Sequence, residues 1–369
     1  MPHLLDGVRV LDFTRVLAGP LATMTLGDMG AHVIKVERPG HGDETRHWGP
    51  PFDERGEAAY FLSVNRNKRS IALDLAREAD AAVVHGLIAG ADVVVENYLP
   101  GALARRGFDP DAILAAHPSL IWCTIGGFAD DPSRPGYDLV VQAEEGWMSV
   151  TGDVDGAPMK HAMALVDVMA GKDAAIAICA ALAARARSTQ PLPAGERRLV
   201  IHLDRSARAA LVNVAQNALV TGRPARRWGN AHANLVPYQA FEAADGWFVI
   251  AAGSDAQFVA CARALGLGAL AADARFASNA GRLAHRAEVT GAIAARVRTG
   301  TATQWVDRLT TAHVPCGLVR SVEQALEGTG ASALTGVPPA VPGAVRLPPA
   351  RLDEHAAELR ASGWAAFGA

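Results

Sequence analysis

Short β-rich runs alternate with helical segments through the first 130 residues of the chain. The β-rich runs VRVLDF, AHVIKVE, SIALDL, DVVVEN and LIWCTIGG occupy residues 8–13, 31–37, 70–75, 92–97 and 120–127. Helical patterns fill the gaps at 21–30 and 79–88, and Asp109-Pro110 supplies a cap and first turn for a third helix. Strands separated by helices form βαβ units, so this alternation predicts an α/β fold with a mostly parallel sheet.

The second half of the chain has a different pattern. Polar, proline-bearing breaks occur at 188–196 and 221–229. Residues 236–253, VPYQAFEAADGWFVIAAG, predict two strands around an Asp245-Gly246 turn, and helical stretches follow at 255–266 and 280–298. We therefore expect a second, smaller α+β domain, followed by a proline-rich tail that packs along the surface.

The length of 369 residues suggests about two domains at roughly 150 residues each. We predict a large domain over 1–200 that is completed by 317–369, and a small domain over 225–316. The linkers are expected at 201–224 and at about 310–330.

Composition excludes several classes of function. The formal net charge of -3 creates no basic field for nucleic acid. The N-terminus does not resemble a signal peptide, and the longest apolar run, 174–184, is far shorter than the ~20 residues that span a bilayer. The four cysteines form no CxxC pair, and no HExxH occurs. We expect a cytoplasmic protein that binds no metal, nucleic acid or membrane.

The first βαβ unit does not match a dinucleotide site. Its loop reads RVLAGPLATMTLGDMG and lacks GxGxxG, and Pro20 stands where a pyrophosphate would approach the backbone. A nicotinamide cofactor is therefore not expected.

Two basic clusters lie next to predicted strands. NRNKRS covers 65–70, and VENYLPGALARRGF, 95–108, places Asn97, Tyr98 and Arg105 just past a strand end. Ligands bind at the carboxyl ends of parallel strands, so these clusters suit a polyphosphate. The alternative is solvated surface charge.

Asp167 stands in an otherwise apolar stretch, ALVDVMAGKDAAIAICAALAAR, with Gly171 four residues later. An aspartate at the start of a helix is commonly an N-terminal cap. The second interpretation is a nucleophile, whose reactivity increases when burial removes its water. The residue pattern around Asp167 leaves both interpretations open.

Taken together, the motifs of the chain resemble the class III CoA-transferases, the family of formyl-CoA and carnitine CoA-transferases that also contains alpha-methylacyl-CoA racemase. The matching stretches occur in order: GVRVLDFTRVLAGP, GDMGAHVIKVERPGHGDETR, NRNKRSIALDL, VVVENYLPGAL, RPGYDLVVQA, DVMAGKDAAIAI, GNAHANLVPYQAF and VPCGLV. The resemblance implies a Rossmann-like large domain, a small α+β domain and an interlaced homodimer. It further implies CoA transfer from an acyl-CoA to a carboxylic acid acceptor, with CoA arriving as part of the substrate and no other cofactor.

In this resemblance Asp167 falls on the catalytic aspartate of the family's D-x-x-x-G element. The carboxylate attacks the acyl-CoA thioester to form an acyl–aspartyl anhydride, and the CoA thiolate returns to form an aspartyl–CoA thioester. The nucleophile must be ionised, so burial should raise its pKa of ~3.9 by no more than about two units.

Tyr137 and Asp138 match the family's tyrosine–acid pair beside the nucleophile. The racemase branch carries a histidine at the tyrosine position, and a tyrosine with a pKa of ~10 is a poor base at neutral pH. We therefore favour a transferase over two alternatives, an acyl-CoA racemase and a catalytically silent CoA-binding protein. The joint presence of Asp167, Tyr137 and Asp138 argues against a catalytically silent protein.

The resemblance also implies contacts to CoA and to the acyl group. The implied CoA contacts are Arg38, Asn97, Tyr98 and Arg105, with Lys68 and Leu73 on the adenine side and Ala18 and Gly19 near the thioester. Leu17 replaces a glutamine of formyl-CoA transferase, and GNAHANLVPYQ at 229–239 replaces its glycine run. This loop is more like those of transferases acting on glutarate or succinate, so we expect C4–C6 dicarboxylates to be better substrates than oxalate with formyl-CoA.

Overall fold

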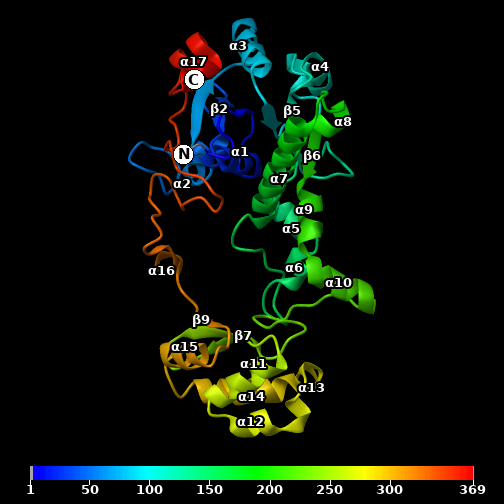
Figure 1. Cartoon of the computed structure of the whole chain (residues 1–369), viewed down its shortest axis with the longest axis vertical. Helices are drawn as coiled ribbons and strands as arrows, with labels where there is room; N and C mark the ends of the chain where they lie inside the picture. Colours follow the sequence, from blue (N-terminus) through cyan, green and yellow to red (C-terminus); the bar gives the residue numbers. More distant parts are fainter. Residues whose placement is uncertain (1–2, 369) are drawn as a thin grey trace. The chain divides into compact units, whose positions relative to one another are not determined.

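The computed structural model describes residues 3–368, and its internal contacts divide the chain into two compact units (Figure 1). The second unit consists of Met148–Met159 and Pro224–Ala325. The first unit holds the rest of the described chain, including the C-terminal segment from Leu326 onward.

The unit boundaries differ from the predicted ones in two places. The predicted small domain, 225–316, lies inside the second unit, which also takes Met148–Met159 and extends to Ala325. The predicted linker 201–224 contains two helices of the first unit, α9 (Leu203–Ala210) and α10 (Val212–Thr221). The segment of α9 belongs to the first unit and is not a linker, because its residues Leu203 and Ala207 are buried in the core of that unit.

The first unit contains a six-stranded sheet in the order β3-β2-β1-β4-β5-β6, and every neighbouring pair is parallel. Its strands are β1 (Arg9–Asp12), β2 (His32–Glu37), β3 (Lys68–Ala72), β4 (Val93–Glu96), β5 (Ile121–Gly126) and β6 (Arg198–His202). The predicted α/β fold is confirmed, and the order is that of a doubly wound sheet. β3 begins two residues earlier than predicted, because Lys68 already pairs with Val33 of β2.

Helices cover both faces of this sheet. One core packs α1, α7 and α9 on the sheet, and the other packs α3, α4 and α17 on the opposite face. The other helices of this unit are α1 (Ala18–Asp28), η1 (Glu44–His47), α2 (Ala59–Leu62), α3 (Glu78–Ala89), η2 (Ala104–Arg106), α4 (Pro110–Ala116), α5 (Asp138–Glu144), α7 (Leu165–Arg187), α8 (Ala194–Arg197), α17 (Ala356–Ser362) and η4 (Gly363–Phe367). The unit boundary falls within α6 (Trp147–Val150). Asp109 caps α4 by accepting from the backbone N–H of Asp111, as predicted.

The second unit is built on a three-stranded antiparallel sheet of β7 (Tyr238–Glu242), β8 (Trp247–Ala251) and β9 (Cys316–Leu318). β7 and β8 form the predicted hairpin around Asp245-Gly246. Its helices are α11 (Asp255–Ala264), α12 (Gly268–Ala272), η3 (Ala274–Phe276), α13 (Asn279–Ala284), α14 (Arg286–Val297) and α15 (Ala302–Thr311), and the unit boundary falls within α16 (Val322–Leu326). The helix predicted over 280–298 is two helices, because His285 leaves the helical conformation between α13 and α14.

The proline-rich tail returns to the first unit. The Asn67 amide donates to the carbonyl oxygen of Ala344 at 2.9 Å and accepts from the backbone N–H of Leu347 at 2.9 Å. Nearby, Arg66 donates to the carbonyl oxygen of Val337. The loop before β3 therefore anchors the tail.

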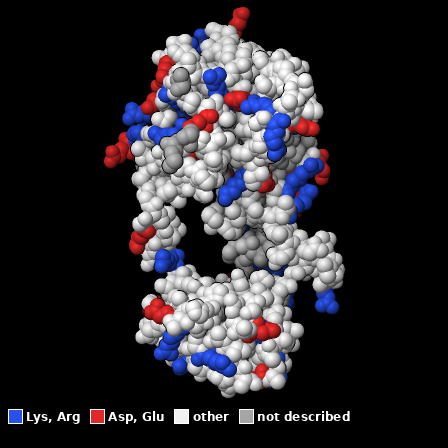
Figure 2. All heavy atoms as spheres, viewed as in Figure 1, with Lys and Arg blue, Asp and Glu red and all other residues white. Residues whose placement is uncertain are grey.

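The distribution of surface charge and the properties of the helices both agree with the composition. On the face shown in Figure 2, basic and acidic side chains are interspersed. Within residues 3–368, none of the helices combines the length and apolarity needed to cross a bilayer.

Candidate active site

Asp167 lies in the first turn of α7 and lines a cavity of about 510 Å³. The residue is only 7 % exposed, because α7 packs closely on α1. Gly171 makes this approach possible, since a Cβ there would lie 2.5 Å from the carbonyl oxygen of Ala18. The close packing brings the start of α1 to the same cavity wall as Asp167.

Asp167 does not cap its helix. The N-cap position of α7 is Ala164, and no side chain of α7 makes a cap hydrogen bond there. The N-terminus of α7 is held from outside by Asp138, whose Oδ1 accepts from the backbone N–H of Val166 at 2.8 Å. The cap interpretation of Asp167 is therefore wrong.

Asp138 belongs to a short chain of partly buried hydrogen bonds. Its Oδ2 accepts from the amide of Gln142 at 2.7 Å, and Oε1 of Gln142 accepts from the backbone N–H of His161 at 2.7 Å. Gln142 is fully buried. These bonds fasten the segment that leads into α7 to helix α5, which sets the position of Asp167.

The carboxylate of Asp167 is buried without a partner. Within residues 3–368 no hydrogen bond or ion pair to its side chain is present, and burial, with a further contribution from the charge of Asp138, raises its pKa to about 7. This rise is larger than the two units that the sequence argument allowed. A carboxylate of this kind is poorly solvated and basic, which are the properties of an activated nucleophile.

Two tyrosines accompany Asp167. Tyr137 is the N-cap residue of α5, lines the same cavity and is 52 % exposed. Burial and the charges of Asp167 and Asp138 raise the pKa of Tyr60 to about 12, so Tyr60 keeps its proton beside the two carboxylates. Trp48 packs edge-on against the Tyr60 ring, with 5.2 Å between the ring centroids.

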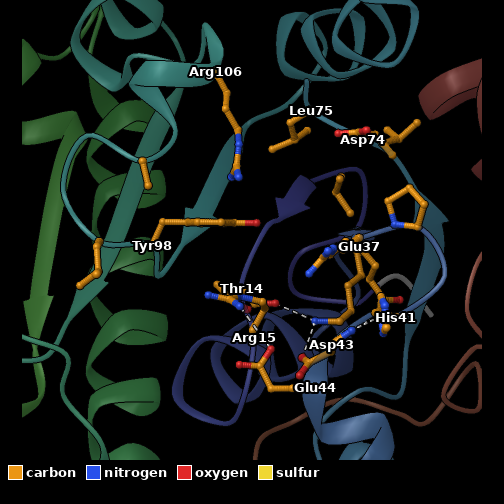
Figure 3. Close-up of a pocket in the computed structure, with 18 of the residues that line it drawn as sticks. Thr14, Arg15, Glu37, His41, Asp43, Glu44, Asp74, Leu75, Tyr98 and Arg106 are labelled. Carbon is orange, nitrogen blue, oxygen red and sulfur yellow. Dashed lines mark hydrogen bonds and ion pairs between the residues drawn. The ribbon is translucent and has the colours of Figure 1, made fainter. Parts of the chain in front are cut away.

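A larger cavity of about 940 Å³ lies next to the first and shares part of its wall. The shared residues are Arg15, Glu44, Tyr98 and Leu99. Figure 3 shows the Tyr98 ring and the Arg106 guanidinium extending into this larger cavity. Among the described residues, neither Arg38 nor Arg106, which both line it, has a carboxylate oxygen within 4.0 Å, so both cations can receive an anionic ligand.

Both cavities lie at the carboxyl ends of the parallel strands. Glu37, Glu96 and Gly126 end β2, β4 and β5 and each line one of the cavities. The connection from β3 to β4 carries the chain to the other half of the sheet, which places the topological switch point between β1 and β4. The cavities lie at this point, where open α/β sheets bind ligands.

A model of CoA-transferase family III matches residues 5–342 of the chain. The succinyl-CoA:glutarate CoA-transferase of Mus musculus is 42 % identical over 322 residues, which is 86 % of this chain and 72 % of that protein. The chain belongs to CoA-transferase family III. The acetyl-CoA:oxalate CoA-transferase of Acetobacter aceti is 36 % identical over 328 residues, covering 87 % of this chain and 82 % of that protein.

The fold agrees with this assignment. The crystal structure of a CAIB/BAIF family protein from Brucella suis superposes with a TM-score of 0.84 at 38 % identity, over 98 % of this chain and 99 % of that one. The chain is thus a class III CoA-transferase, an enzyme that moves CoA between acyl-CoA and carboxylic acids. These comparisons favour the transferase over the racemase and silent-binder alternatives.

In this transferase, most residues implied by the resemblance line the two cavities. The smaller cavity brings together Asp167, Tyr137, Ala18, Asn97 and Tyr98. The larger cavity takes in Arg38, Leu73 and Tyr98. Asp138 stands behind Asp167 rather than in the cavity lining, and Gly19 is buried at the start of α1, where a Cβ would collide with Thr14.

Lys68 and Arg105 are not brought to either cavity. Lys68 is 1 % exposed, and its ammonium donates to Asp12, to the carbonyl oxygen of Pro20 and to Asn65. The expected contact from Lys68 to CoA is therefore not possible in this arrangement. Arg105 is exposed in η2, and its neighbour Arg106 lines the larger cavity instead.

The basic loop 65–70 is also neither a polyphosphate surface nor solvated charge. Arg66, Asn67 and Lys68 are all buried, and Arg66 pairs with Asp28 at 2.7 Å. The loop is internal scaffold.

Sequence reasoning missed Tyr60, Arg106 and Glu96. Burial raises the pKa of Glu96, which ends β4 and accepts hydrogen bonds from Thr124 and from the backbone N–H of Tyr98. Glu96 and Arg106 both lie within VENYLPGALARRGF, so that motif contained a signal for them. No local pattern marks Tyr60, whose proximity to Asp167 arises from tertiary packing.

Proposed function

We propose that this enzyme moves CoA from a dicarboxylic acyl-CoA donor, such as succinyl-CoA, to a free C4–C6 dicarboxylic acid, with Asp167 as the nucleophile. The observation that carries the proposal is the partnerless, buried carboxylate of Asp167 in the cavity wall. Every other carboxylate lining that cavity, Glu44 and Glu96, already accepts a hydrogen bond from a protein donor.

The reaction is a double displacement at Asp167. Its carboxylate oxygen attacks the thioester carbonyl, the C–S bond breaks, and CoA leaves as the thiolate. The thiolate then attacks the aspartyl carbonyl, which releases the donor acid and leaves an aspartyl–CoA thioester. The acceptor carboxylate and the thiolate repeat the two steps in reverse order, which restores the carboxylate with no net proton transfer.

The larger cavity suits the nucleotide end of CoA. Arg38 and Arg106 supply cations for its phosphates, and the apolar side chain of Leu73 lies on the same wall. Tyr98 belongs to both cavities, so the pantetheine arm would pass it on the way to Asp167. Charge neutralisation and a continuous path support this placement.

The acyl specificity is supported by two observations. Leu17 lines the smaller cavity and offers a small polar acyl group no hydrogen bond. A relative at 42 % identity is named for succinyl-CoA and glutarate, whereas the relative named for oxalate is 36 % identical.

The test is a matrix of acyl-CoA donors and free acids with mass detection of new CoA esters. We expect succinyl-CoA with C4–C6 dicarboxylates to give the highest kcat/KM and formyl-CoA with oxalate a low one. Hydroxylamine added during turnover should convert Asp167 to a hydroxamate, adding about 15 Da to its peptide. Equal kcat/KM for the two pairs would refute the specificity, and an unmodified Asp167 would refute the nucleophile.

We also propose that the enzyme is an obligate, interlaced homodimer. None of the ten residues of α10 is buried, although Val212, Leu219 and Val220 are large and apolar. Leu139 on α5 and Ile176 on α7 are exposed as well. Exposed apolar surface of this extent on one unit is typical of a face that a second copy covers.

Light scattering over a dilution series tests the dimer. We expect no folded monomer, and we expect Leu219→Asp/Val220→Asp to abolish dimerisation and folding together. Asn213→Asp/Gln216→Asp is the matched control, because it adds the same two negative charges at exposed polar positions of α10. A folded, active monomer would contradict the proposal.

A further inference from the structure

Val16 holds a strained backbone conformation at the edge of the smaller cavity. Its φ is 72°, in the left-handed region that β-branched residues rarely adopt. The residue lies in the loop between β1 and α1 and lines the cavity together with Leu17 and Ala18. Strain of this kind persists only when surrounding contacts hold it, and it concentrates at functional sites.

Asn97 holds the loop from the end of β4. Its side-chain amide donates to the carbonyl oxygen of Arg15 at 2.7 Å and accepts from the backbone N–H of Arg15 at 3.0 Å. Both ends of the amide are therefore engaged by the residue directly before Val16.

Asp43 holds the same loop at the next residue. Its Oδ1 accepts from the backbone N–H of Val16 at 3.3 Å, and its Oδ2 accepts from the ammonium of Lys35 at 3.1 Å. Lys35 also donates to the carbonyl oxygen of Thr14 at 2.7 Å. Three consecutive residues, 14–16, are thus fastened by side chains from β2, from the residue after β4 and from the N-cap of η1.

The fastened loop directs the start of α1. Leu17 is the N-cap residue of α1, and the carbonyl of Ala18 packs against Gly171 of the nucleophile helix. Arg15 belongs to the wall shared by both cavities. A relaxed Val16 would move this wall relative to Asp167.

We propose that Asn97 is a positioning residue: with Asp43 it holds Val16 left-handed, so that the first turn of α1 faces a thioester held over Asp167. The proposal rests on Asp167 as the reacting group. It gives the Asn97 side chain a different role from direct contact with CoA, because both ends of the amide are already bonded to the loop.

Asn97→Ala in the wild type and in a Val16→Gly background tests the proposal. Glycine adopts a φ of 72° without strain, so the loop then needs no clamp. We expect Asn97→Ala to lower kcat about 30-fold or more, with KM for the acyl-CoA changed less than about threefold. Relative to Val16→Gly alone, the same change should cost less than about threefold. An equal loss in both backgrounds, or a loss confined to KM, would overturn the proposal.

Asn97→Asp provides a second variant if Asn97→Ala does not fold. It keeps the acceptor for the N–H of Arg15 and loses the donor to its carbonyl, so we expect a smaller kcat loss that Val16→Gly again reduces. Hydroxylamine labelling of the wild type separates the two proposals. Labelled Asp167 without coupling between positions 97 and 16 refutes only the positioning role, whereas unlabelled Asp167 refutes the nucleophile itself.

Discussion

The first unit contains two kinds of buried carboxylate, one with charged partners and one without. Asp12 and Asp43 are buried in an ion cluster, defined here as Asp12, Lys35, Asp43 and Lys68, with Lys68 3.0 Å from Asp12 and Lys35 3.1 Å from Asp43. Asp167 is almost as deeply buried, but no cation or hydrogen-bond donor of the described chain contacts its side chain.

The pKa shifts of these carboxylates follow their partners rather than their burial. Burial alone would raise the pKa of Asp12, but Lys68, Lys35 and the hydroxyls of Thr14 and Thr23 outweigh it and keep that pKa below its usual value. For Lys68 the balance is the reverse: among the described residues Asp12 is its one carboxylate within salt-bridge distance, and burial outweighs that partner and lowers the pKa of Lys68 to about 8. For Asp167, burial and Asp138 both act upward, to a pKa of about 7.

This difference in partners distinguishes carboxylates that stabilise the fold from a carboxylate that is free to react. A buried carboxylate with all its partners present is stable and unreactive, and its loss disrupts the fold. A buried carboxylate without partners destabilises the folded enzyme and is available to a substrate carbonyl. The ion cluster holds the loop and strand ends around the cavities, and Asp167 is the group that we propose reacts with the thioester.

The strongest test of this comparison is Asp167→Asn. An amide forms neither the anhydride nor the aspartyl–CoA thioester, so we expect kcat to fall by at least about 10³-fold with the fold intact. Asp173→Asn on the same helix is the matched control, since Asp173 bonds Ser206 and lines neither cavity. Substantial turnover by the Asp167 variant in a steady-state assay would show that the partnerless carboxylate is not the nucleophile.

The ion cluster should respond in stability instead. Asp12→Asn leaves Lys68 buried without its charge partner, and we expect a loss of about 3–5 kcal/mol in the free energy of unfolding. Urea unfolding measures it. A loss below about 1 kcal/mol would mean that burial, not pairing, sets the role of these groups.

Asp167→Asn should also stabilise the protein, in contrast to Asp12→Asn. Because the folded-state pKa of Asp167 lies above its unfolded value, ionisation opposes folding at high pH, and the penalty is complete above about pH 7 and absent below about pH 4. We expect a gain of about 2–4 kcal/mol at pH 8 that disappears at pH 4. Thermal melts of the variant and the wild type at both pH values measure this gain in stability. A gain that is the same at pH 8 and pH 4 would exclude the ionisation of Asp167 as its cause.

Asp138→Asn should give the smallest of these effects, a shift in pH dependence. In the wild type we expect kcat/KM to fall as pH drops through about 7, because the nucleophile becomes protonated. Removing the charge of Asp138 should lower the pKa of Asp167 and move that limb to lower pH. If the limb does not move, Asp138 contributes to the site through its hydrogen bonds with Val166 and Gln142 and not through its charge.

Local sequence determined the order and type of most elements. The β-rich runs became β1 to β5, Asp109 caps α4, and Asp245-Gly246 turns the β7–β8 hairpin. These features depend on alternation, capping and turn chemistry within a few residues, so they can be predicted without the fold. The motif resemblance likewise pointed to Asp167, Tyr137 and Ala18, which the structure brings to one cavity.

Tertiary structure alone decided which charged residues reach the cavities and which are paired inside the core. Lys68, in a loop that suggested a phosphate site, is paired inside the core, and Arg106 rather than Arg105 reaches the larger cavity. Asp138 caps α7, and Asp167 has no side-chain hydrogen bond to any residue between 3 and 368. The sequence shows that a residue carries charge, but its burial and its partners come from elements far apart in the chain, and these contacts set its pKa and its reactivity.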